Sequence, residues 1–77
     1  MLKVPNKEML GMLRKEYPAG TRVELVSMPP DGYSPPPPIG TKGTVISVDD
    51  VGTIHVAWDN GSSLGVTFDT DKCRKIQ

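Results

Sequence analysis

The segment TIHVAWDNGSSLGVTF constrains the fold more than any other part of the chain, because it specifies both a turn and a register. Apolar and polar residues alternate on either side of its Asp-Asn-Gly turn, which is typical of a β-hairpin. A two-residue turn would put the apolar residues of the two strands on opposite faces, because a one-residue slip reverses every side chain. A three-residue loop over 59–61, with a left-handed glycine, instead pairs Ile54 with Val66 and Val56 with Leu64. We predict that loop and one core face composed of Ile54, Val56, Trp58, Leu64, Val66 and Phe68.

Three further segments have the composition of short strands: TRVELVSM, GTVISV and CRKI. Turn signals separate them, and each is too short to form a core without the others. Strongly twisted short strands around one apolar face predict a mainly β fold, a small SH3-like barrel of four to five antiparallel strands. We assign this barrel to residues 19–77, and its long variable loop to the proline-rich segment 28–41.

Residues 1–18 have a helical rather than an alternating pattern. Asn6 is a plausible N-cap, and Pro18 ends the helix because it disfavours helical geometry in the preceding residue. Gly11 costs up to about 1 kcal/mol inside a helix. We therefore expect one N-terminal amphipathic helix that packs on the barrel or at a dimer interface through Leu10, Leu13 and Tyr17.

Composition narrows the classes of function. With 77 residues the chain has room for one domain, and nine basic residues balance nine acidic ones. A zero net charge gives no general attraction to nucleic acid or to an anionic membrane. No apolar run is long enough to span a bilayer. The lone Cys73 cannot form an internal disulfide, so we expect a protein of a reducing, cytoplasmic compartment.

The motifs GTRVEL, GTKGTV, GTIHVAWDNGSSLG and RKI lie between Tyr17 and Ile76. In these motifs the chain resembles a family of short bacterial proteins described as a domain of unknown function, found in Gram-positive bacteria, their phages and conjugative elements. This resemblance implies an accessory protein of a phage or mobile element. The shorter stretch GTVISVDDVGTIHVAWDNG resembles mind-bomb-type SH3-like barrels, which bind peptides.

No combination of residues predicts catalysis. His55 alternates with core residues, so it is expected to face solvent, and Cys73 is expected to be a small packing residue. The aspartates lie mostly in or beside turns, where they cap backbone groups. No spacing of histidine, cysteine and carboxylates matches a metal site. We expect no enzyme activity, no metal and no cofactor.

The first functional hypothesis is a non-enzymatic binding module. Its ligand would be a host or phage protein, or a small nucleotide-type signal held between the subunits of a homodimer or higher oligomer. The proline run lacks the basic flank of an SH3 ligand, so it serves either as a structural loop or as part of this chain's own binding surface. The predicted ligand-binding residues are Tyr33, Arg22, Glu24, Asp59, Asn60, Ser62 and Ser63.

The alternative hypothesis is a nucleic-acid-binding accessory barrel. Basic residues cluster in the helix and again near the C-terminus, and they would form one face if the termini converge. Against this, most aromatic residues are assigned to the core, which leaves little surface for base stacking. The predicted nucleic-acid contacts are Arg14, Lys15, Lys72, Arg74 and Lys75.

Overall fold

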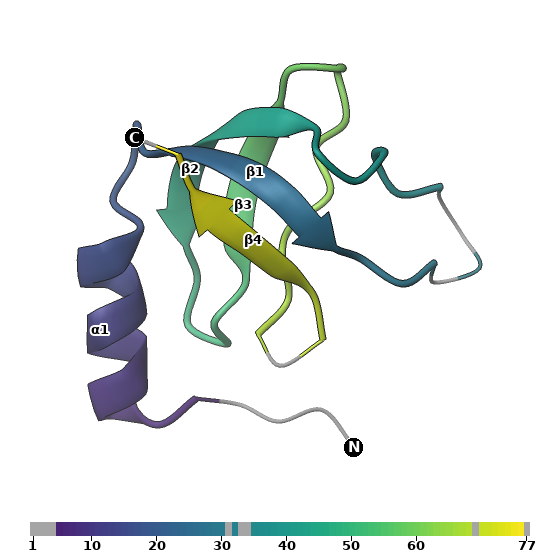
Figure 1. Ribbon diagram of the computed structural model, residues 1–77. Coiled ribbons are helices and arrows are strands. Elements are labelled where there is room, and N and C mark those ends of the chain that lie inside the picture. The colour runs from purple at the N-terminus through teal and green to yellow at the C-terminus, as the bar shows by residue number, and fades with distance from the viewer. Residues whose placement is uncertain (1–4, 31, 33–34, 69, 77) are drawn as a thin grey trace.

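The computed structural model describes residues 5–30, 32, 35–68 and 70–76. One helix precedes four strands along the chain (Figure 1): α1 (Lys7–Glu16), β1 (Arg22–Ser27), β2 (Lys42–Val48), β3 (Ile54–Trp58) and β4 (Lys72–Lys75). The strands form one antiparallel sheet of order β3-β2-β1-β4. The prediction of a mainly β fold with one N-terminal helix is confirmed. The described strands form an open sheet with β3 and β4 at its two edges, and the SH3-like barrel stays a prediction.

The 59–61 loop has the predicted register. Ile54 and Val66 exchange both backbone hydrogen bonds, at 2.9 and 2.8 Å, and the Trp58 amide donates to the Ser62 carbonyl at 3.0 Å. Gly61 is left-handed, with φ at 93°. The three-residue loop is therefore confirmed, and it keeps the inward residues of both segments on one side of the sheet.

The segment after the loop is less regular than its sequence pattern predicts. Among the described residues, Val66 is the only position there that forms a β-bridge to β3, and Val56 and Leu64 do not form one. The Leu64 carbonyl instead accepts a hydrogen bond from the Trp58 indole Nε1 at 2.7 Å. The expected fifth strand is replaced by an irregular segment because the buried indole needs an acceptor.

The core lies on the inward face of β1, β2 and β3. Of the six predicted core side chains of the hairpin, four are buried, whereas Leu64 and Phe68 are only partly buried. The inward residues of β1 and β2 complete the core because they alternate with outward polar residues. The buried apolar residues are Val23, Leu25, Val45, Val48, Ile54, Val56, Trp58 and Val66.

Helix α1 stands to one side of the sheet (Figure 1). The Asn6 side chain accepts a hydrogen bond from the Met9 amide at 2.9 Å, which confirms the predicted N-cap. No residue of α1 is fully buried. Its apolar stripe is nevertheless packed against the core, as the sequence pattern indicated, through Leu10, Leu13 and Tyr17.

Leu25 and Val26 are neighbours on β1, and their side chains lie on opposite faces of the sheet. Leu25 is 1% exposed and Val26 is 43% exposed. We expect Leu25→Ala to lower the free energy of unfolding by about 2–5 kcal/mol, because it leaves a cavity in the core. Val26→Ala should change it by less than about 0.5 kcal/mol. Urea unfolding followed by Trp58 fluorescence measures both, and equal losses in the two variants would contradict the assignment.

Candidate functional site

Arg22 and Asp59, two residues of the predicted ligand surface, lie together on the outward face of the sheet. The two terminal nitrogens of Arg22 donate to the two carboxylate oxygens of Asp59 at 2.9 and 2.7 Å. One of these nitrogens also donates to Thr44 Oγ1 at 3.0 Å. The pair lowers the pKa of the Asp59 carboxyl and raises that of the Arg22 guanidinium. The two charges therefore satisfy each other, and they link β1 to the end of β3.

Glu24, on the same strand as Arg22, is also in an ion pair. Its Oε1 accepts hydrogen bonds from Arg74 at 2.8 and 3.3 Å. Glu24 was predicted to contact a ligand and Arg74 to contact nucleic acid, on two different surfaces. The register of β1 with β4 places them opposite each other, so the two predicted surfaces overlap.

One basic residue of α1 and a second one of β4 are also in ion pairs. Arg14 forms an ion pair of 2.6 Å with Asp50, and its Nε donates to the Val48 carbonyl. Lys75 pairs with Glu16, which raises the pKa of the lysine and lowers that of the glutamate.

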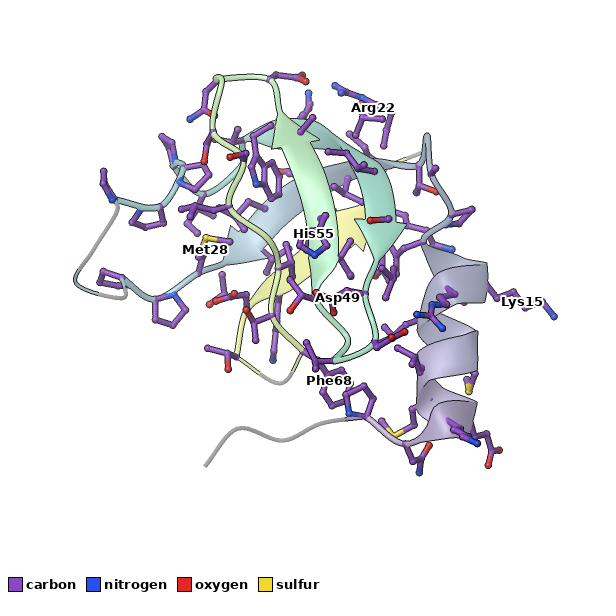
Figure 2. The ribbon with its side chains drawn as sticks, turned by 180° about the vertical axis from the view of Figure 1, so that it is seen from behind. Lys15, Arg22, Met28, Asp49, His55 and Phe68 are labelled. Atoms are coloured by element: carbon purple, nitrogen blue, oxygen red, sulfur yellow. The ribbon has the colours of Figure 1, made fainter. Side chains whose placement is uncertain are left out.

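These pairs leave little of the predicted basic face. Within the described part of the chain, two of the five predicted nucleic-acid contacts have no ion pair, Lys15 and Lys72. They lie on different elements, and Lys15 points away from the sheet (Figure 2). The other three predicted contacts, Arg14, Arg74 and Lys75, each have a carboxylate partner.

Two of the remaining predicted residues, Asn60 and Ser62, shape the hairpin loop. Asn60 Oδ1 accepts from the Ser62 amide at 3.0 Å, and Ser62 Oγ accepts from the Leu64 amide at 3.4 Å. Ser63 is exposed. Tyr33 lies outside the described residues. The polar side chains at 60 and 62 therefore stabilise the local backbone of the hairpin loop.

The end of the proline-rich loop is part of the fold. Pro37 is buried, and the Gly40 amide donates to the Leu25 carbonyl at 2.9 Å. The Thr41 hydroxyl and amide both donate to the Pro38 carbonyl, at 2.6 and 3.0 Å. These contacts support the structural interpretation for residues 37–41.

Asp49 and His55 form a pair that the sequence patterns did not reveal (Figure 2). His55 Nε2 lies 2.9 Å from Asp49 Oδ2, across the turn between β2 and β3. The other carboxylate oxygen accepts from the amides of Val51 and Thr53 at 3.1 and 2.9 Å. Partial burial raises the pKa of Asp49, but these hydrogen bonds outweigh it and hold that pKa below its ordinary value. His55 does face away from the core, and the Asp49 carboxylate orients its ring.

A groove runs between α1 and β4, and the sequence patterns did not indicate it either. It consists of two adjoining hollows of about 220 and 210 Å³ that share Leu13 and Phe68 as walls. Phe68 was assigned to the core; it is in fact half-buried and projects beside the start of α1 (Figure 2). The first hollow is lined by Leu13, Tyr17, Gly52, Ile54, Val66, Thr67, Phe68, Asp71, Lys72 and Cys73. The second is lined by Met9, Met12, Leu13, Glu16 and Phe68.

The family model described as "Domain of unknown function (DUF4314)" matches residues 6–76. The chain belongs to this family. No curated protein and no solved structure matches it.

Among residues 5–30, 32, 35–68 and 70–76, no three histidine, cysteine or carboxylate side chains lie close enough to hold a metal ion together. The ten-residue α1 is the one helix in this part of the chain, and it is too short to cross a bilayer.

The Asp49 contacts predict how stability depends on pH. Because the pKa of Asp49 is lower in the folded chain than its ordinary value of 3.8, its stabilising effect is complete above about pH 4 and is lost as the pH falls through the folded value. Asp49→Asn should be less stable at neutral pH and should lose less stability between about pH 5 and pH 2. Urea midpoints across this range measure the effect.

Asp50→Asn is the control from the same turn, because the Asp50 side chain is 94% exposed and its exposed ion pair with Arg14 contributes little to stability. We expect it to keep the acid dependence of the wild type. An Asp49→Asn variant with the same acid dependence as the wild type would contradict the assigned role of the carboxylate.

Cys73 should react slowly with thiol reagents. Burial raises the pKa of its thiol from 9.0 to about 11, so at mildly alkaline pH the thiolate fraction is about a hundredfold smaller. Ellman's reagent should modify the folded chain far more slowly than the chain in urea. Equal rates in the two conditions would show that the thiol is not protected.

Proposed function

We propose that this DUF4314 domain is a non-enzymatic binding module of the SH3-like type that holds an extended segment of a partner protein in the groove between α1 and β4. The observation that carries this proposal is the apolar lining of the groove. Met9 and Met12 are 42% and 61% exposed at its mouth. Methionine side chains are flexible and polarizable, and they are common on surfaces that accept varied apolar partners.

The open edge of β4 supplies backbone groups beside this lining. In the described part of the sheet, β4 pairs with β1 alone. The Ile76 amide donates to the Arg22 carbonyl. Because hydrogen bonds alternate along a strand, the amides and carbonyls of Cys73 and Lys75 point to the other side. An extended peptide would add to this edge as a further strand and place alternate side chains over the groove.

The charged side chains that line the groove determine which peptide charge it favours. Asp71 accepts a hydrogen bond from the Thr67 amide at 2.9 Å, and Glu16 is paired with Lys75. Lys72 also lines the groove, and this basic residue has no ion pair among the described residues. A carboxylate of the ligand can pair with Lys72, so the peptide that we propose has one large apolar side chain next to a carboxylate.

This function fits an accessory protein of a phage or mobile element in the bacterial cytoplasm, which the family resemblance implies. The groove is apolar rather than basic, which favours a protein ligand over a nucleotide-type signal. The nucleic-acid alternative is less well supported, because carboxylates pair with three of its five contacts, Arg14, Arg74 and Lys75.

An amide-shift titration tests the proposal with three capped hexapeptides, GSFESG, GSFKSG and GSSESG. The first should shift the resonances of Leu13, Phe68 and Cys73, the second should bind more weakly, and the third should bind least. Phe68→Ala should weaken binding of GSFESG about fivefold or more, because truncating a central aromatic contact removes much of the binding energy. The matched control is Ile39→Ala, which removes an exposed apolar side chain outside the groove.

Lys72→Ala should abolish the preference for GSFESG over GSFKSG, whereas Lys42→Ala should keep it. Equal binding of all three peptides, or shifts confined to the Arg22 and Glu24 face, would overturn the proposal. Binding of oligothymidylate that falls steeply with salt and is lost in Arg74→Ala would favour the nucleic-acid alternative.

A further inference from the structure

We propose that α1 is also a self-association surface, through which two copies of this chain pair with their helices antiparallel. This inference goes beyond the proposed peptide groove and does not depend on it. It rests on the outward face of α1, which has an exposed apolar residue, an unexplained glycine and two charges of opposite sign.

The outward face consists of residues at helical spacings of three, four and seven: Glu8, Gly11, Met12 and Lys15. All four are exposed, and they lie opposite the stripe that packs against the core. Figure 2 shows Lys15 projecting away from the sheet. A partner helix can therefore reach this face without disturbing the fold.

Gly11 has no role within the described chain that requires a glycine. Its φ is not positive, and a Cβ built at this position would meet no atom within 4 Å. Glycine is nevertheless the least favourable residue inside a helix after proline. A second helix crossing at this point would explain it, because the missing side chain lets two helices approach closely.

Charge and shape complement each other in one antiparallel register. When residue 11 of one copy faces residue 12 of the other, the exposed Met12 side chain lies over the notch at Gly11. The same register brings Glu8 opposite Lys15 of the second copy, and the two-fold axis repeats the pair at the other end. Neither Glu8 nor Lys15 has an ion pair among the described residues.

The parallel arrangement is disfavoured by the same charges. It would place Glu8 against Glu8 of the second copy and Lys15 against Lys15, so both contacts would repel. A ten-residue helix is about 15 Å long, so the interface is small and self-association is weak and concentration-dependent.

The experiment reverses one charge at a time and then mixes the variants. Glu8→Lys and Lys15→Glu should each weaken self-association about tenfold, because two attractive contacts become repulsive. An equimolar mixture of the two variants restores both attractive contacts, so it should form heterodimers at the strength of the wild type. Sedimentation equilibrium over a concentration series to the millimolar range measures all three. The E8K/K15E double variant should recover self-association as well.

Gly11→Leu provides a steric test. It should abolish self-association while raising helix stability, so loss of the dimer cannot be assigned to unfolding. The Phe68→Ala variant should still self-associate, although it should no longer bind the peptide. The two proposals can therefore fail independently of each other. A wild type that stays monomeric throughout the series, single variants that associate as the wild type does, or a mixture that fails to pair would each overturn the inference.

Discussion

The pairing of Ile54 with Val66 across a three-residue loop is the constraint on which the rest of the molecule depends. This register places the apolar residues of β3 and of the following segment on one face, and a slip of one residue would expose half of them. It also brings the Trp58 indole to the Leu64 carbonyl, which interrupts the second strand. The chain then turns at Thr67, so Phe68 lies beside α1 and not inside the core.

Part of the balanced charge of the chain is arranged as specific ion pairs. Arg22 with Asp59 and Arg74 with Glu24 cross the outward face of the sheet, and two further pairs fix the helix to the body. Exposed pairs of this kind contribute little to stability individually. Their main consequence is for function, because they neutralise the basic clusters that would otherwise attract a polyanion. Among the described residues the apolar groove is therefore the more distinctive surface.

Helix α1 packs on the core, and we propose that two more of its sides bind a peptide and a second copy of the chain. Leu10 and Leu13 pack toward the core, Met9 faces Phe68 across the groove, and Gly11 lies on the outward side. A small domain buries a modest fraction of its surface and gains from any further contact that covers apolar side chains. The two proposed contacts, one to a peptide and one to a second copy of the chain, would each cover such side chains.

The sequence by itself determined the local structure: the helix and its Asn6 cap, four of the five predicted strands, the left-handed Gly61 and the register of the hairpin. These follow from periodicity and turn chemistry, which act over a few residues. Only the tertiary structure decided which charges meet, because the partners of Arg22 and Glu24 are 37 and 50 residues away. It also decided that the sheet is open and that a groove separates α1 from β4. Strand order and the position of the helix depend on the packing of the whole core, which no local pattern specifies.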